Sequence, residues 1–174
     1  IKLGQLLSTR TDLFERSVTQ ELNKLTDSCA PVAFEFIKET IETQLLSKAG
    51  KILMTIEEKP LASASLAQVH KFKIGGEDFV IKVQRPGLEE LVKRDLDALK
   101  LAAKYSSFFL KYYPRVKPLE LIEQYENVIF QELDFRIEAA NSNKTYENFK
   151  SSNYLEIPKI ADDFTTKKIL VMPF

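Results

Sequence analysis

A lysine within an apolar run is the first residue of this sequence that could do chemistry. Lys82 stands between Ile81 and Val83, in a segment rich in the β-branched residues that favour a strand. Burying an ammonium group is costly unless a carboxylate or a phosphate compensates its charge. Lys82 therefore either points to solvent at the edge of a sheet or has a specific partner.

Two glutamates farther along the chain are candidate partners. Glu132 and Glu138 fall in an apolar series that begins at about Pro118 and continues to Ala140, which predicts one long amphipathic helix. Their spacing of six residues places the two carboxylates about 120° apart around the helix axis. They cannot both reach one lysine easily, but they could serve two different lysines.

A loop of small residues precedes the lysine. It contains Ala62, Ser63, Ala64 and Ser65, whose small side chains would let backbone N–H groups approach a bound anion. Alanine and serine lack the access to positive φ that glycine has, so such a phosphate loop would be stiffer than a glycine-rich one. A tightly packed connection between two strands is the alternative. No histidine or lysine stands beside either serine, so we interpret both serines as loop formers rather than nucleophiles.

Apolar periodicity predicts the helices around these candidates. The helices are expected over residues 17–26, over residues 31–45 with Gly50 closing the helix, over residues 88–103, and over the series that begins at Pro118.

Strand signals lie on both sides of Gly75-Gly76. The β-branched stretches 69–74 and 79–83 predict a hairpin, and the apolar face on each strand predicts a sheet covered on one side. Arg85-Pro86-Gly87 should end the second strand, because proline has no N–H for the ladder and glycine permits a sharp turn. Two further short strands are expected over residues 157–160 and 168–172.

The composition limits what else the chain could be. Its 174 residues hold 25 Lys+Arg and 25 Asp+Glu, so no net charge draws in nucleic acid and a charge-driven nucleic-acid binder is excluded. One cysteine, Cys29, and one histidine, His70, leave no internal disulfide and no Cys/His set for zinc, so we interpret both as structural. No apolar stretch approaches the roughly 18 residues of a membrane span. The first residue is Ile1 and the chain ends in an apolar run, so we expect a piece of a longer protein.

Four spaced motifs carry a resemblance to a known family. They are Lys2-Leu3-Gly4-Gln5, the stretch from Pro60 to His70, the stretch from Val80 to Pro86, and Glu132-Leu133-Asp134-Phe135 followed by Glu138-Ala139-Ala140-Asn141. In this order they resemble the ABC1/ADCK/UbiB atypical protein-kinase-like family over essentially the whole chain. The stretch 8–14 and Ala30-Pro31 look closest to the bacterial UbiB branch, which is tied to ubiquinone biosynthesis.

This resemblance implies an α+β fold, the small N-terminal lobe of a protein-kinase-like domain. A short antiparallel sheet with the long helix packed on it would be decorated by extra helices at the N-terminus and after Lys82. The resemblance divides the chain into a KxGQ-type helical extension over residues 1–50 and the kinase-like lobe, up to the hinge, over residues 51–174.

The resemblance also implies roles for single residues. Lys82 matches the family's nucleotide-binding lysine in the third strand, and Glu138 matches the helix glutamate that pairs with it to orient the α- and β-phosphates. The small-residue loop replaces the usual glycine-rich phosphate loop. Met172 lies where the last strand approaches the hinge that holds adenine through backbone groups. There Pro173 departs from the glutamate often found, since it offers a carbonyl but no N–H.

Two further motifs match regulatory elements of the family. Lys2 and Gln5 match its KxGQ signature, in an extension that folds over the active site and limits access for protein substrates. Glu132 and Asp134 match its ExD motif, with Glu132 near the KxGQ lysine. Solvated side chains on helix surfaces are the alternative for all four residues.

The implied function is that of an atypical kinase-like ATPase that binds ATP or ADP with Mg²⁺ and supports ubiquinone (coenzyme Q) biosynthesis. The catalytic and metal-binding Asp residues of kinase-like folds lie in the second lobe, so we expect no metal ligand and no activity in these residues alone. A non-catalytic module that binds an isoprenoid lipid or biosynthetic proteins is the alternative. The resemblance suggests a membrane-associated protein, at the cytoplasmic side of a bacterial inner membrane or in a mitochondrion or plastid.

Overall fold

The computed structural model describes residues 8, 11, 15–23, 29–109 and 117–174. In chain order, these residues form α2 (Arg16–Asn23), α3 (Phe34–Leu45), the 3₁₀ turn η1 (Leu46–Lys48), α4 (Ala49–Leu53), β1 (Ala62–Ser63), β2 (Ala67–Ile74), β3 (Glu77–Gln84), α5 (Leu88–Phe109), α6 (Pro118–Glu132), α7 (Phe135–Phe149), the 3₁₀ turn η3 (Asp162–Phe164) and β4 (Ile169–Pro173).

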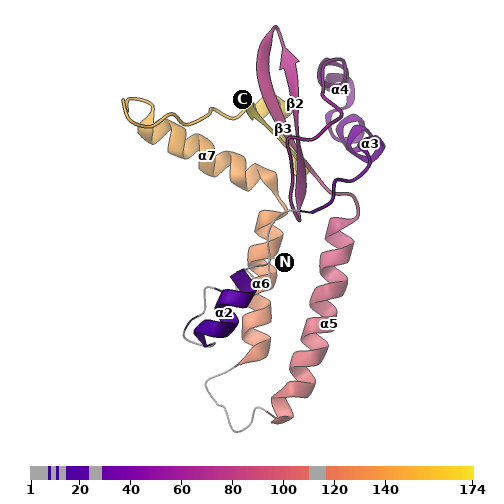
Figure 1. Ribbon diagram of the computed structural model, residues 1–174, viewed down its shortest axis with the longest axis vertical. Coiled ribbons are helices and arrows are strands. Elements are labelled where there is room, and N and C mark those ends of the chain that lie inside the picture. The colour runs from indigo at the N-terminus through magenta and orange to yellow at the C-terminus, as the bar shows by residue number, and fades with distance from the viewer. Residues whose placement is uncertain (1–7, 9–10, 12–14, 24–28, 110–116) are drawn as a thin grey trace.

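The arrangement is built around one small sheet (Figure 1). Helices α3 and α4 lie against one side of the sheet, and α7 projects from the opposite side. Helices α5 and α6 pack against each other and extend away from the sheet. The α+β class is therefore confirmed, with additional helices before the sheet and between β3 and α7. No helix within the described ranges has both the length and the apolar character needed to cross a bilayer.

The sheet has four antiparallel strands in the order β1-β2-β3-β4. The predicted hairpin is present as β2 and β3, and its turn needs glycine because Gly75 and Gly76 have φ of 61° and 90°. Strand β3 ends at Gln84, as the following proline and glycine predict. Lys82 lies in the middle of the sheet, opposite Val69 of β2 and Leu170 of β4.

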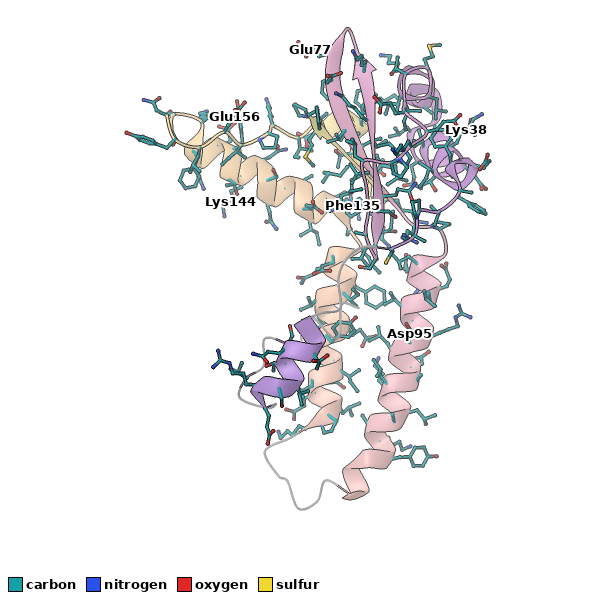
Figure 2. All side chains as sticks on the ribbon, viewed as in Figure 1. Lys38, Glu77, Asp95, Phe135, Lys144 and Glu156 are labelled. Atoms are coloured by element: carbon teal, nitrogen blue, oxygen red, sulfur yellow. The ribbon has the colours of Figure 1, made fainter. Side chains whose placement is uncertain are left out.

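Alternation along the strands creates two different faces. One face packs against α3 and α4 in the larger core cluster, and Figure 2 shows how densely side chains gather there. That cluster contains Ile37, Ile41, Leu45, Ala49, Ile52, Phe72, Ile81, Val83, Ile169 and Val171. The opposite face carries Lys82 and is covered in part by the start of α7, through Phe135 and Ala139 against Ala67 and Leu170. The α3 side is therefore covered as expected, and the opposite face is covered only in part, by the start of α7.

The prediction of one helix from Pro118 to Ala140 is wrong, because α6 ends at Glu132 and α7 begins at Phe135. Asp134 between them is extended, with φ −115° and ψ 95°, and its carboxylate accepts a hydrogen bond from the backbone N–H of Arg136. Asp134 is thus the N-cap of a new helix, a position that aspartate favours.

Two tertiary hydrogen bonds fix this break. The side-chain amide of Gln84, which is 3 % exposed, donates to the Leu133 carbonyl at 2.9 Å. The N–H of Phe135 donates to the carbonyl of Lys167 at 3.0 Å. The apolar spacing continues across the break because Leu133 is itself buried, so periodicity alone could not reveal it.

Smaller differences concern the helix before the sheet and the segment before β4. Helix α3 ends at Leu45 rather than at Gly50, and Leu46 has the only positive φ, 50°, among the non-glycine residues that the structure describes. Gly50 lies inside α4. The predicted strand over residues 157–160 is absent, because the N–H of Ile160 bonds to the Asn143 side chain instead of a neighbouring strand.

A buried polar network lies on the α3 side of the sheet. The Nδ1 atom of His70 is 2.8 Å from the Glu57 carbonyl, so Nδ1 carries the proton, and Nε2 accepts from the Gln68 amide at 2.9 Å. The Gln68 amide oxygen in turn accepts from the N–H of Val32 at 2.9 Å. If His70 were protonated on Nε2 as well, that N–H would point at the N–H of the Gln68 side chain. Rotating the Gln68 amide to offer its oxygen to His70 would break its hydrogen bond from the Val32 N–H. Both ring nitrogens of His70 are thus engaged within the core, which agrees with a structural role for this residue.

Lowering the pH should destabilise the protein through this network. Burial lowers the pKa of His70 from its usual 6.5, so the folded state keeps the ring neutral while the unfolded chain takes up a proton. Stability is therefore fully present above about pH 6.5 and is lost as the pH falls below it, by at most about 1.4 kcal/mol per pH unit. Urea unfolding between about pH 7.5 and 5.5 measures this dependence.

The matched variant is His70→Asn. Its amide can still donate to the Glu57 carbonyl but does not titrate in this range. Although the lost ring will lower stability at every pH, the slope between about pH 6.5 and 5.5 should become smaller. Equal slopes for the two proteins would show that His70 is not responsible.

Candidate nucleotide site

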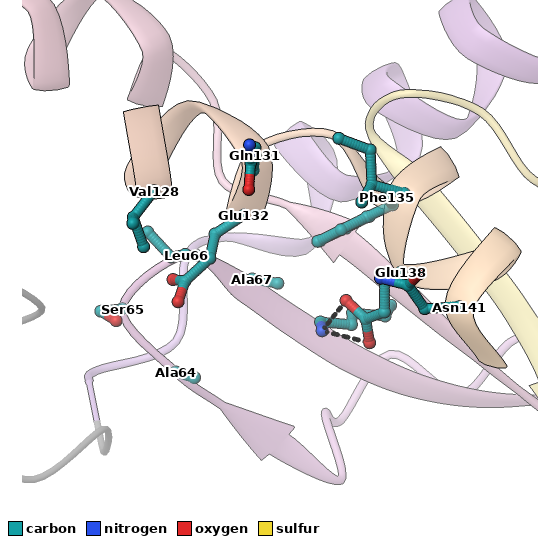
Figure 3. A pocket seen from close by; sticks show the side chains of 12 residues that line it. Ala64, Ser65, Leu66, Ala67, Val128, Gln131, Glu132, Phe135, Glu138 and Asn141 are labelled. Carbon is teal, nitrogen blue, oxygen red and sulfur yellow. Dashed lines mark hydrogen bonds and ion pairs between the residues drawn. The ribbon is translucent and has the colours of Figure 1, made fainter. Parts of the chain in front are cut away.

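A pocket of about 510 Å³ opens between the small-residue loop, the sheet and the α6–α7 break (Figure 3). It is lined by Ala64, Ser65, Leu66, Ala67, Lys82, Val128, Gln131, Glu132, Phe135, Ile137, Glu138 and Asn141. The pocket therefore brings together parts of β2, β3, α6 and α7 that lie far apart in the sequence.

Lys82 has a specific partner across this pocket. Its ammonium donates to both carboxylate oxygens of Glu138, at 2.9 and 2.7 Å, and lies 4.7 Å from the centre of the Phe135 ring. Glu138 stands in the first turn of α7, where the helix dipole favours a carboxylate. The Lys82 and Glu138 side chains are 31 % and 45 % exposed, so a ligand in the pocket can reach the pair.

Only half of the small-residue loop lines the pocket. Ala64 and Ser65 do, whereas Ala62 and Ser63 form β1 and pair with β2. The Ser63 hydroxyl is 2.9 Å from the Arg85 guanidinium, so this serine has a structural contact. Ser63 therefore supports the loop from outside the pocket.

The two residues of the proposed ExD motif have different surroundings. Glu132 lines the pocket, and Figure 3 shows its carboxylate directed toward Ser65 and Leu66. Asp134 does not line it; its carboxylate caps α7 and lies 2.6 Å from the Arg136 guanidinium, which lowers the pKa of Asp134. The estimate of 120° between Glu132 and Glu138 does not apply, because the two residues belong to different helices.

Three other predicted residues lie away from this pocket or outside the described chain. Met172 on β4 is half-buried and packs beside the cluster that includes Phe135, without lining the pocket. Lys2 and Gln5 lie outside the described residues. Their proximity to Glu132 stays a prediction.

Several pocket residues were not anticipated as such from the sequence. Phe135 and Asn141 belong to the motif over residues 132–141, which predicts no pocket role for them, and Gln131 and Val128 belong to the end of α6. Asn141 follows Glu138 by three residues, so the two share one face of α7. The spacing of three residues between Glu138 and Asn141 would have predicted that Asn141 lines the pocket, if the start of a helix at Phe135 had been known.

The described residues contain no group of three or more His, Cys, Asp or Glu side chains that could hold a metal ion. Glu132 and Glu138 are the pocket's carboxylates, and Glu138 is engaged by Lys82. Mg²⁺ in nucleotide sites is bound by one or two carboxylates together with phosphate oxygens. The pocket lining therefore supplies the Lys82 ammonium for a phosphate and one carboxylate, that of Glu132, with which Lys82 does not pair.

A lysine in the third strand of an antiparallel sheet, paired with a glutamate of the helix on that sheet, defines the small lobe of a protein-kinase-like protein. A sequence model of the ABC1 atypical kinase-like domain matches residues 24–174. The chain belongs to this family.

Curated relatives support the UbiB branch of the family. A protein of Pseudomonas entomophila named "Probable protein kinase UbiB" is 40 % identical over 173 residues, which cover 99 % of this chain and 32 % of that protein. A protein of the same name from Pseudomonas aeruginosa is 39 % identical over the same share of each chain. The chain thus spans about a third of the length of these relatives.

A solved structure agrees in fold. The complex structure of Rv3197 with erythromycin from Mycobacterium tuberculosis matches with a TM-score of 0.67 and 21 % identity, over 99 % of this chain and 42 % of that one. At this identity the match supports the kinase-like fold and nothing further.

The cap of α7 is testable because this helix carries Glu138. Asp134→Ala should lower the free energy of unfolding by about 0.5–2 kcal/mol, since it leaves the N–H of Arg136 without its acceptor. Asp134→Asn keeps an acceptor oxygen and should cost less, because the exposed ion pair to Arg136 contributes little. Chemical unfolding measures both variants, and equal losses would show that the charge of Asp134 matters more than the cap.

Proposed function

We propose that this chain contributes the ATP- or ADP-binding small lobe of an atypical kinase-like ATPase, and that the complete protein supports ubiquinone biosynthesis. The observation that carries the proposal is the ion pair in the wall of the pocket, in which the Lys82 ammonium contacts both carboxylate oxygens of Glu138. The pocket volume of about 510 Å³ falls within the range of about 300–1,000 Å³ for ligand sites.

Lys82 is suited to hold a phosphate. An ammonium group has three donors, and Glu138 accepts from it through two oxygens. The glutamate thus orients the ammonium while leaving donor capacity for an α- or β-phosphate oxygen. The Phe135 ring beneath the ammonium further limits where it can move.

The loop and the last strand would hold the rest of the nucleotide. Ala64 and Ser65 present small side chains at the pocket, so phosphate oxygens can approach the backbone there. A backbone carbonyl at Met172–Pro173 would accept a hydrogen bond from the adenine amino group, whereas Pro173 has no N–H to donate to the ring. Mg²⁺, when bound, would neutralise charge on the phosphate oxygens, and we expect its ligands in the second lobe of the kinase-like fold.

The N-terminal residues and the ExD motif are proposed as regulatory parts. In this proposal the segment of the 1–50 extension that carries Lys2 and Gln5 lies over the nucleotide site and approaches Glu132, whereas α3 of the same extension packs on the opposite face of the sheet. The position of Glu132 on the pocket wall supports this assignment, because a group bound to its carboxylate would cover the pocket.

A second candidate function is a non-catalytic module that binds an isoprenoid lipid or biosynthetic proteins. Exposed apolar side chains on α5, namely those of Leu91, Leu101 and Tyr105, favour it. The complete protein would then act at the cytoplasmic side of a bacterial inner membrane, or in a mitochondrion or plastid. Phosphate release from ATP separates the candidates, since the binding module would show none.

Lys82→Met should abolish or strongly weaken ATP binding by the complete gene product. Loss of a charge-assisted contact to phosphate corresponds to at least about a tenfold rise in the dissociation constant. Isothermal titration with ATP measures it. Lys93→Met is the matched control, because Lys93 also pairs with a glutamate but on the surface of α5.

The control should bind ATP like the unaltered protein. An Lys82→Met protein that is folded and binds ATP with unchanged affinity would refute the nucleotide assignment. Glu138→Gln should give an intermediate loss, because glutamine still accepts one hydrogen bond from Lys82 but carries no charge.

A further inference from the structure

One arginine binds the small-residue loop from the side of β3. The Nε atom of Arg85 donates to the Ala64 carbonyl at 2.8 Å, and a terminal nitrogen donates to the Ser63 hydroxyl at 2.9 Å. The backbone N–H of Arg85 also donates to the Leu66 carbonyl at 3.0 Å. The main chain and the side chain of one residue therefore hold the loop at Ser63, Ala64 and Leu66.

The same guanidinium reaches the segment that precedes α3. It donates to the Ala30 carbonyl at 2.7 Å. The neighbouring Cys29 N–H donates to the Ser63 carbonyl at 3.0 Å, and the Val32 N–H donates to the Gln68 side chain at 2.9 Å. Residues 29–32 are thus joined at three points, to the loop at Ser63, to β2 at Gln68 and to Arg85 after β3.

The acceptors of Arg85 are neutral. Among the described residues no carboxylate pairs with Arg85, and its guanidinium donates to two carbonyls and a hydroxyl. A guanidinium has five donors in a fixed planar arrangement, so it can hold several backbone groups in a defined mutual orientation. The contacts of Arg85 therefore fix backbone geometry rather than compensate charge.

The bond to the Ala64 carbonyl matters because a peptide group is planar and trans. A carbonyl held toward Arg85 directs the N–H of the next residue, Ser65, to the opposite side of the same plane. Ala64 and Ser65 both line the pocket, and the Ala64 N–H is already bonded to the Ala67 carbonyl at 2.9 Å. A rotation of this peptide would exchange the positions of its carbonyl and its N–H, so the carbonyl would face an anion that approaches from the side opposite Arg85.

We propose that Arg85 is a positioning residue, which fixes the Ala64–Ser65 peptide for binding the phosphates of a nucleotide and couples that peptide to residues 29–32. The proposal rests on the proposed nucleotide-binding function. Arg85 acts through the loop backbone and makes no contact with the nucleotide itself.

The test compares ATP with AMP on the complete gene product. Arg85→Gln should weaken ATP binding about tenfold, whereas the affinity for AMP should change less than about twofold, because the loop acts on the outer phosphates. Arg85→Lys keeps the positive charge but not the planar set of donors of the guanidinium, so its ATP affinity should lie between those of Arg85→Gln and the unaltered protein. Arg94→Gln makes the same change at an exposed position of α5 and should leave both affinities unchanged.

Each result decides the proposal. A folded Arg85→Gln protein with the unaltered ATP-to-AMP affinity ratio overturns it, and so do equal losses for both nucleotides, which would indicate a merely structural arginine. Thermal unfolding checks the fold, and if Arg85→Gln does not fold, the ratio in Arg85→Lys decides in the same way. An unaltered protein that binds neither nucleotide refutes the proposed function, and the role of Arg85 with it.

Discussion

The ion pair between Lys82 and Glu138 links the middle of the sheet to the first turn of α7, and much of the structure around it is needed to bring these two side chains together. Strand β3 must turn the lysine away from the α3 core, and α7 must begin immediately after α6. A partly exposed ion pair contributes only about 0–1 kcal/mol of stability. Its arrangement is therefore better understood through ligand binding than through folding.

The parts of the fold that depend on local chemistry could be predicted from the sequence. Gly75-Gly76 between two β-branched stretches was sufficient for the hairpin, because positive φ at the turn is a local requirement. The α6–α7 break was missed because its causes are distant: Gln84 binds the Leu133 carbonyl across 49 residues, and Lys167 accepts from Phe135. An apolar series cannot report hydrogen bonds to residues so far away.

Of the site, the lysine could be predicted from the sequence, but its partner and the arginine that supports the loop could not. Lys82 could be identified because a charge within an apolar strand demands a partner. Helical spacing alone could not choose between Glu132 and Glu138, and the choice came from the family resemblance. The sequence assigns Arg85 to the end of a strand and to a family motif but gives it no role, since its contacts are to Ala64 and Ala30, which are 21 and 55 residues away.

The short connection between α6 and α7 joins the helical pair α5–α6 directly to the helix that carries Glu138. Helix α5 has 22 residues, so it is about 33 Å long, and a rotation of roughly 5° at its base moves its far end by about 3 Å. The connection consists of Leu133 and Asp134, and the Gln84 amide anchors it to the sheet through the Leu133 carbonyl. A change in the direction of the pair relative to the sheet would therefore involve the same two residues that precede the first turn of α7, where Glu138 stands.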